Sequence, residues 1–315
     1  MLPLTTVSQS LTVVIPVYNG AATLPALIER LVPVARAAGA PYEIILVNDG
    51  SWDRSWDVIS ELSSRSPAVR GFNLMRNYGQ HNALLCGIRA AKYDVIVTMD
   101  DDLQHPPEEI AQLLARLDEG FDVVYGTPKA EQNGFLRAVA SRITRLALST
   151  AVGSDVGKNV SAFRVFRTRL REAFADYHSP FVSIDVLLSW TTSRFGAVAV
   201  DFRPRHAGPS NYTLAKLVRH ALDVMTGFST LPLQLASMVG FACTLFGMGV
   251  LIYVIGSYLF QGSIPGFPFV ASLIAIFSGA QLFALGVIGE YLARIHFRMM
   301  NRPLYVVRSV SGEGK

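Results

Sequence analysis

The chain has 315 residues, of which 50% are hydrophobic and only 17% are charged, and its formal net charge is +4. Soluble domains usually carry about 25% charged residues, so part of this chain is expected to avoid water. Between Asp223 and Glu290 the sequence has no charged residue and no histidine. It also lacks a compact Lys/Arg stripe interleaved with aromatic residues, the pattern that nucleic-acid-binding surfaces show. We therefore expect no nucleic-acid partner, and we expect the basic residues beside the apolar region to face anionic lipid.

Short apolar runs alternate with helical patterns in the N-terminal part of the chain. This alternation predicts an α/β fold, in which helices cover both faces of a parallel sheet. Ligands of such sheets bind at the carboxyl ends of the strands. The predicted strands are Leu11–Pro16, Glu43–Val47, Gly71–Leu74, Val95–Met99 and Val123–Tyr125, and the predicted helices are Ala22–Ala38, Trp52–Ser64, Gln80–Ala91 and Pro107–Glu119.

The pattern is less regular after Tyr125. Phe135–Ala151 has the spacing of an amphipathic helix, and the segments Phe163–Phe166 and Val198–Phe202 are predicted as further strands. Leu214–Phe228 is again helical in pattern and leads into the apolar region.

Two apolar stretches follow, at about residues 233–260 and 269–291, and each is long enough to cross a bilayer, which takes about 20 residues. The short Gly- and Pro-rich link between them predicts a hairpin whose outer ends lie on one side. Lys and Arg flank both outer ends and the link is uncharged, so the outer ends are expected to be cytoplasmic. A buried helical pair in a soluble protein is the alternative. The predicted units are a cytoplasmic domain at 1–210, an amphipathic juxtamembrane segment at 211–231, two transmembrane helices within 232–293 and a cytoplasmic tail at 294–315.

The N-terminus lacks a charged region followed by an apolar one, so no cleaved signal peptide is predicted.

The strongest chemical signal is Asp100–Gln104, the run DDDLQ directly after a predicted strand. Three carboxylates at a strand end repel one another unless a cation lies between them, and hard oxygen ligands suit a divalent cation. Alternate residues at a strand end point the same way, so Asp100 and Asp102 can share that cation, with Gln104 as a further oxygen donor. A solvated acidic turn that caps the next helix is the alternative, and both can hold together.

Two other polar loops follow the first and second predicted strands. Pro16–Asn19 ends the first strand, and Asp49 follows the second. Because the carboxyl ends of neighbouring parallel strands form one crevice, we expect both loops to lie near the acidic run. An aspartate there can accept hydrogen bonds from a base N–H or a ribose hydroxyl, whereas a plain Asx-turn is the alternative for Asp49. His81 and His105 are expected to be surface or supporting residues rather than bases.

These motifs, in this order and spacing, resemble the family-two glycosyltransferases, and within them the polyprenyl-phosphate branch that includes dolichyl-phosphate mannose synthase. The resemblance covers about Leu11 to Val307. It is carried by Pro16–Asn19, Asp49–Ser51, Arg76–Gly79, Asp100–Gln104 with Pro106–Glu108, and Arg302–Tyr305 after the two spans.

The resemblance implies a GT-A (Rossmann-like) catalytic domain followed by a two-helix transmembrane hairpin in the inner (plasma) membrane. It implies inverting transfer of one sugar from a UDP- or GDP-linked donor to undecaprenyl phosphate, with Mg²⁺ or Mn²⁺ as cofactor. The implied site residues are Pro16, Val17, Tyr18, Asn19, Asp49 and Asp100 for the nucleotide, Asp100, Asp102 and Gln104 for the metal, Lys129, Arg137, Ser141 and Arg205 for the lipid phosphate, and Asp100, Asp102 and Arg137 for catalysis.

Some positions depart from the family pattern. Pro128 stands where the family often has an arginine, and the family's acidic residue before Phe163 is replaced by Ser161-Ala162. We therefore name no catalytic base. A lipid phosphate is already largely ionised at neutral pH, so its oxygen can attack without one.

Two other functions remain open from the sequence. A processive polysaccharide synthase would share the acidic run, but the Gln-x-x-Arg-Trp signature and the additional spans of those enzymes are missing. A non-enzymatic membrane scaffold for sugar-lipid translocation would have no need of clustered carboxylates. Small residues of the spans, Gly240, Gly247 and Gly249, would allow close helix packing, including packing into a homo-oligomer.

Overall fold

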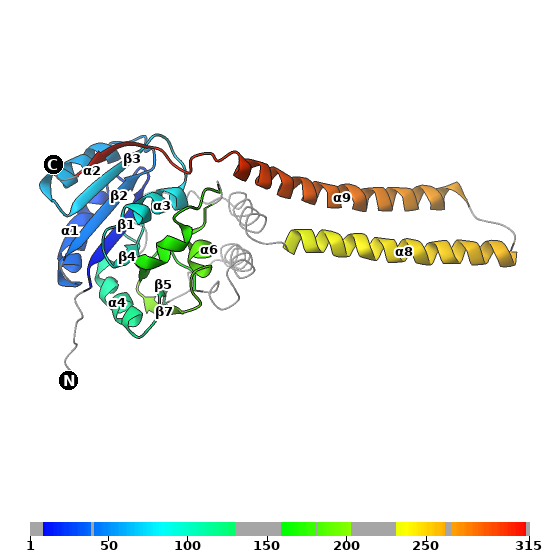
Figure 1. The fold of residues 1–315 in the computed structure, drawn as a ribbon, viewed down its shortest axis with the longest axis horizontal. Helices are drawn as coiled ribbons and strands as arrows, with labels where there is room; N and C mark the ends of the chain where they lie inside the picture. The colour runs from blue at the N-terminus through cyan, green and yellow to red at the C-terminus, as the bar shows by residue number, and fades with distance from the viewer. Residues whose placement is uncertain are drawn as a thin grey trace.

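The computed structural model describes residues 9–38, 41–129, 159–179, 182–202, 231–261 and 266–312. An α/β body contains the sheet, and two long helices project from it side by side (Figure 1). The predicted helices Phe135–Ala151 and Leu214–Phe228, and the juxtamembrane segment, lie outside the described residues.

The sheet has eight strands in the order β7-β5-β6-β4-β1-β2-β3-β8. Its centre is parallel, since β1 pairs with both β2 and β4, and β2 pairs with β3; β6 and β8 run antiparallel to their neighbours. The mostly parallel α/β fold is thereby confirmed. The strands are β1 (Leu11–Val17), β2 (Tyr42–Asn48), β3 (Val69–Leu74), β4 (Val95–Thr98), β5 (Val123–Pro128), β6 (Arg164–Arg167), β7 (Phe195–Val200) and β8 (Val307–Ser311).

Helices cover both faces of the sheet, because successive strand residues point to opposite faces. In β1, Val13 and Ile15 pack into one core, whereas Val14 packs into the other. The first core is closed by α1 (Leu24–Ala38), α2 (Ser55–Arg65) and α4 (Ile110–Asp118), which follows the 3-10 turn η1 (Pro107–Glu109). The second core is closed by α3 (Gln80–Ala90), the 3-10 segment η2 (Thr168–Phe174) and α6 (Ile184–Ser189).

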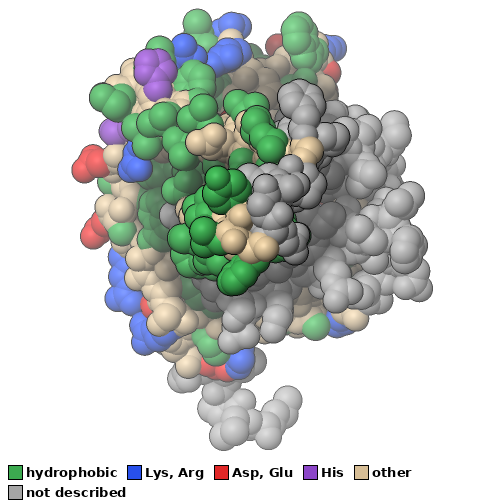
Figure 2. All heavy atoms as spheres, turned by 90° about the vertical axis from the view of Figure 1, so that its right-hand side faces the viewer, with side chains coloured by type: hydrophobic (Ala, Val, Ile, Leu, Met, Phe, Trp, Pro, Cys, Tyr) green, Lys and Arg blue, Asp and Glu red, His purple; other side chains and the backbone are tan. Residues whose placement is uncertain are grey.

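The helical pair consists of α8 (Leu231–Gln261) and α9 (Phe267–Met299). Both helices are long and apolar enough to cross a membrane, and their apolar stretches are not buried by the rest of the chain. Figure 2 shows the face from which they project, with hydrophobic side chains gathered on the pair. These features indicate membrane association. A Cβ atom at Gly247 would meet the Phe277 ring at 2.5 Å, so this glycine permits the contact between the two helices.

The C-terminal segment differs from the predicted tail. After α9 the chain returns to the α/β body, where β8 pairs antiparallel with β3 and Leu304 is buried in the second core (Figure 1). Tyr305 lies beneath the Arg89 guanidinium, with 6.0 Å from its carbon to the ring centroid. Val307–Ser311, within the predicted cytoplasmic tail, is therefore the last strand of the sheet.

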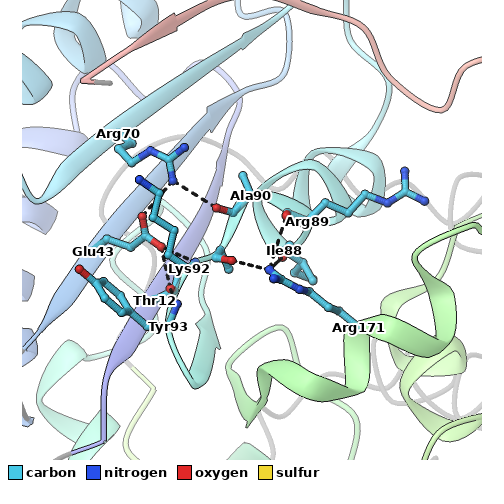
Figure 3. A network of polar contacts seen from close by, with 10 residues as sticks. Thr12, Glu43, Arg70, Ile88, Arg89, Ala90, Lys92, Tyr93 and Arg171 are labelled. Carbon is cyan, nitrogen blue, oxygen red and sulfur yellow. Dashed lines mark hydrogen bonds and ion pairs between the residues drawn. The ribbon is translucent and has the colours of Figure 1, made fainter. Parts of the chain in front are cut away.

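A buried polar network joins the amino ends of the central strands to the end of α3 (Figure 3). Glu43 accepts hydrogen bonds from the Thr12 hydroxyl at 2.9 Å and from the Lys92 backbone N–H at 2.7 Å. Its other oxygen pairs with Arg70 Nη1 at 3.0 Å, and both side chains are less than a tenth exposed. Arg70 also donates to the Ala90 carbonyl. The network ties the first three strands and α3 into one unit.

Candidate active site at the carboxyl edge of the sheet

The loops after β1 and β2 are joined into one structure at the carboxyl edge of the sheet. The Asn19 backbone N–H donates to Ser51 Oγ at 3.0 Å, and the Trp52 backbone N–H donates back to Asn19 Oδ1 at 2.9 Å. The Gly20 backbone N–H donates to Ser55 Oγ at 2.9 Å. Asn19 has a φ of +57°, a left-handed conformation that asparagine tolerates well. The structure thus brings Pro16–Asn19 and the loop after Asp49 together, as predicted.

Asp49 lies beneath these loops and is 3% exposed. Its carboxylate accepts hydrogen bonds from the backbone N–H groups of Tyr78 at 2.7 Å and Gly79 at 2.9 Å. Burial raises the pKa of Asp49, and these two hydrogen bonds oppose the rise. A Cβ atom at Gly50 would collide with the backbone of Asn77, so glycine is required there. Asp49 therefore fixes the loop after β3 against the loop after β2, and each carboxylate oxygen retains a further lone pair for a ligand.

The acidic run follows β4 at the same edge. Asp100 Oδ1 accepts a hydrogen bond from Gln80 Nε2 at 2.6 Å, and Asp102 Oδ1 accepts one from the Gln104 backbone N–H at 3.1 Å. Asp101 lies against the loop after β1, where its Oδ2 is 3.4 Å from the Tyr18 backbone nitrogen. A Cβ atom at position 20 would collide with that carboxylate.

The three carboxylates affect one another strongly. Burial, and then the nearby charge of Asp100 and Asp102, raises the pKa of Asp101 to about 7. An ordinary aspartate has a pKa near 3.9. Burial is the main cause of this rise, and the two neighbouring carboxylates add to it.

This pKa predicts a pH-dependent stability. Between about pH 4 and pH 7 the folded protein holds a proton on Asp101 that the unfolded chain has lost, so stability falls as pH rises. Asp101→Asn removes the charge and is expected to raise the unfolding midpoint of metal-free protein at pH 8 by about 5 °C. The difference in unfolding midpoint between the variant and the wild type should become smaller toward pH 4. Thermal unfolding in EDTA across this range measures it, with the exposed Asp57→Asn as control; a gap that does not change with pH contradicts the prediction.

His105 and two phenylalanines support the acidic run from within the core. His105 is 5% exposed and lies between Phe163 and Phe202, with ring centroids 5.3 Å and 4.9 Å apart. Its Nδ1 accepts the Asp100 backbone N–H at 3.1 Å, so the neutral ring carries its proton on Nε2. Burial lowers the pKa of His105, which favours this neutral form. His105 therefore orients the backbone of Asp100, as a supporting residue.

A buried ion pair holds the end of β4 in place. Arg164, which is 1% exposed, pairs with Asp185 of α6 and donates from Nε to Thr98 Oγ1 at 3.0 Å. The Tyr125 hydroxyl donates to the same Asp185 oxygen at 3.0 Å. Thr98 donates in turn to the Ala162 carbonyl at 2.8 Å. Two residues before Asp100, the strand is thus held by a charge pair that is almost completely buried.

The donor set suits a divalent cation bound together with a ligand. Among the residues that the structure describes, no three His, Cys, Asp or Glu side chains converge as a complete metal site. Asp100 and Asp102 supply two carboxylates and Gln104 an amide oxygen, all hard ligands. The run of three consecutive carboxylates just after β4 is the feature that favours a cation here. Such a set leaves coordination positions for phosphate oxygens, which is how Mg²⁺ is often bound.

The predicted lipid-phosphate residues are only partly described. Lys129 follows β5 at the same edge and its Nζ pairs with Asp201 at 2.6 Å, which raises the pKa of Lys129. Arg137, Ser141 and Arg205 lie outside the described residues. No carboxylate precedes Phe163 here: Ser161 Oγ accepts the Phe163 backbone N–H, and Ala162 supplies only its carbonyl.

Three contributors to the site were not assigned a role from the sequence: Gln80, Arg164 and Asp185. Gln80 is the first residue of α3 and lies in the polar run after β3. Its position at the carboxyl edge of a strand could have indicated a role in the site. Asp185 carries no local signal, because its partner lies 21 residues away on another element.

Comparisons with known proteins agree with this geometry. A family model described as "Glycosyl transferase family 2" matches residues 12–177. The undecaprenyl-phosphate 4-deoxy-4-formamido-L-arabinose transferase of Serratia proteamaculans is 37% identical over 310 residues, which cover 97% of this chain and 95% of that protein. The protein of the same name from Proteus mirabilis is 35% identical over 311 residues, or 98% and 95% of the two chains.

Solved structures of similar fold include glucosyl-3-phosphoglycerate synthase from Mycobacterium tuberculosis. Its complex with phosphoglyceric acid has a TM-score of 0.53 at 19% identity, and the match covers 70% of this chain and 80% of that chain. Its complex with Mn²⁺ and UDP-glucose has a TM-score of 0.51 at 19% identity, with coverage of 69% and 77%. At these identities the likeness shows the fold alone, a GT-A-like sheet.

Proposed function

This chain belongs to glycosyl transferase family 2, and from that premise we propose that it transfers a single sugar from a nucleotide-sugar donor to undecaprenyl phosphate. The observation that carries the proposal is the 37% identity to an undecaprenyl-phosphate sugar transferase over 97% of the chain, α8 and α9 included. The donor is UDP- or GDP-linked, and the product is a lipid-linked sugar for cell-envelope modification.

The donor binds at the carboxyl edge of β1, β2 and β4. Pro16–Asn19 and Asp49 hold the nucleoside, and Asp100, Asp102 and Gln104 hold Mg²⁺ or Mn²⁺ against the diphosphate. When bound, the metal neutralises charge that develops on the leaving nucleoside diphosphate. The buried pair Arg164–Asp185 and the ring of His105 keep the acidic run in position, so that little reorganisation accompanies the reaction.

The reaction is a single displacement with inversion. An oxygen of the lipid phosphate forms a bond to the anomeric carbon, while the bond from that carbon to the nucleoside diphosphate breaks. Because the phosphate is already largely ionised near neutral pH, no general base is required, in keeping with Ser161-Ala162 in place of an acid. Lys129, Arg137, Ser141 and Arg205 position the phosphate, and arginine suits its bidentate binding. Lys129 pairs with Asp201, so to bind the phosphate it must either contact both groups or break the ion pair.

The membrane arrangement follows from the helical pair. We propose that α8 and α9 cross the inner membrane as a hairpin, with the α/β body on the cytoplasmic side. The basic residues after Glu290, among them Arg294 and Arg298, support that side. The pairing of β8 with β3 also supports an end of α9 on the same side as the body.

A donor screen tests the function. Purified protein in detergent is given undecaprenyl phosphate, Mg²⁺ or Mn²⁺, and a panel of UDP- and GDP-sugars, and the lipid fraction is analysed by mass spectrometry. We expect one product that carries exactly one sugar and that disappears in EDTA. A polymer would instead indicate a processive synthase, and donor binding with no lipid product would favour a scaffold.

A further inference from the structure

We propose that Trp52 receives the nucleobase of the donor and holds Tyr18 in position to do the same, so that the pair forms an aromatic platform at the base end of the donor site. Trp52 is then a nucleotide-binding residue outside the predicted nucleotide-binding set. This inference rests on the proposed function, because it assumes that the ligand of the crevice is a nucleoside diphosphate derivative.

The exposure of Trp52 is the first observation. Its side chain is 88% exposed and Tyr18 is 43% exposed. Burial of a large aromatic side chain is favourable. A tryptophan that is almost fully exposed is therefore well suited to bind a ligand that covers it. Among described residues 9–202, four large hydrophobic side chains are exposed, and these two lie side by side.

Both rings are held in fixed positions. The indole N–H of Trp52 donates to the Tyr18 hydroxyl at 3.1 Å, and the Trp52 backbone N–H donates to Asn19 Oδ1 at 2.9 Å. An exposed side chain anchored at its backbone and at its ring tip has lost conformational freedom before any ligand arrives. Such preorganisation lowers the entropic cost of binding a flat ligand.

The position of the pair fits one end of a nucleoside diphosphate. Tyr18 contacts two parts of the candidate site, since its backbone nitrogen lies 3.4 Å from Asp101 of the acidic run and its hydroxyl accepts the Trp52 indole N–H. With the diphosphate and cation at the acidic run, the base extends toward the aromatic end. Trp52 belongs to the loop that begins at Asp49, whose carboxylate is held by the Tyr78 and Gly79 backbone N–H groups. Stacking supplies affinity because every base has a π-face.

The test separates the base end of the site from the phosphate end. Binding of UDP, GDP and inorganic pyrophosphate, each with Mn²⁺, is measured by calorimetry on the full chain in detergent. Trp52→Ala is expected to raise the Kd of the preferred nucleotide about tenfold and to leave that of pyrophosphate unchanged. Trp52→Phe keeps a ring but loses the N–H, so its loss should be smaller. Tyr18→Phe removes the acceptor of the same hydrogen bond, and combining it with Trp52→Phe should add little.

Trp190→Ala is the matched control, since Trp190 is also exposed but packs against Tyr177 with ring centroids 5.8 Å apart. It should bind all three ligands as the wild type does. In turnover assays, Trp52→Ala should raise the KM for the donor more than it lowers kcat.

Two results would overturn the inference: nucleotide binding that Trp52→Ala leaves intact, or an equal loss of pyrophosphate binding. A wild type that binds no nucleotide would overturn it together with the proposed function. If nucleotide binding depends on Trp52 but no sugar reaches the lipid, the proposed function fails while this inference stands.

Discussion

Asp102→Ala is expected to lower the rate of sugar transfer by about a thousandfold while leaving the protein folded. The carboxylate is one of the two charged ligands that we propose for the cation at the acidic run. Without it the charge of the leaving diphosphate loses its main stabilisation, an effect that commonly costs a factor of about 10²–10³ or more. Turnover with a saturating donor, followed by mass spectrometry of the lipid product, measures the loss.

Glu61→Ala is the control for this variant, because Glu61 is an exposed carboxylate whose partner Arg65 lies one turn away on α2. It should retain the full rate. The thermal unfolding of Asp102→Ala should resemble that of the wild type in EDTA, and addition of Mn²⁺ should stabilise the wild type more than the variant. Full activity in Asp102→Ala would remove the proposed metal site.

Glu43→Ala is expected to cost about 3–5 kcal/mol of stability, because it leaves the buried Arg70 without its counter-charge. The change also removes the acceptor of the Thr12 and Lys92 hydrogen bonds shown in Figure 3. For a body of this size the midpoint of thermal unfolding should fall by roughly 10 °C. Circular dichroism of the full chain in detergent measures it.

The same Glu61→Ala variant serves as the comparison, since an exposed glutamate–arginine pair contributes only about 0–1 kcal/mol. Replacing both buried partners, Glu43→Met with Arg70→Met, should recover much of the loss, because no charge is then left unpaired. If Glu43→Ala and Glu61→Ala unfold at the same temperature, the network of Figure 3 has no special role in stability.

The central strands could be predicted from the sequence because each signals itself locally. The runs in β1 and β2 are continuous in hydrophobic residues, and the structure buries them on both faces. In the α/β body the boundaries moved by at most three residues; for example, α2 begins at Ser55 rather than at Trp52. The second apolar helix extends further than predicted, to Met299 rather than to about residue 291. The Trp52–Arg54 stretch has helical spacing, but it lies in the loop before α2, where the Trp52 backbone N–H donates to Asn19 Oδ1.

The last strand could not be predicted in this way. β8 is short and alternates between half-buried and exposed positions, so its hydrophobic signal is weak. Its partner β3 precedes it by more than two hundred residues, with both apolar helices between them. Antiparallel pairing over such a separation is a property of the folded molecule.

The candidate site likewise has residues that local sequence could predict and contacts that it could not. Asp100, Asp102 and Asp49 follow strands directly, and topology alone brings them to one edge. The supporting contacts, such as Gln80 to Asp100 and Arg164 to Asp185, join separate elements whose approach depends on packing. Residue type and spacing therefore indicated the chemistry, whereas the contacts that hold these residues in place depend on how separate elements pack in the folded protein.

The late return of β8 bears on how the protein is made. The ribosome releases β8 only after the whole of α8 and α9 has been synthesised. Until then β3 is an open sheet edge, with unpaired backbone N–H and C=O groups of the kind that invite pairing with other chains. The sheet is therefore completed only after the helical pair has been synthesised. A nascent chain that stalls before α8 carries an incomplete sheet with an open edge at β3.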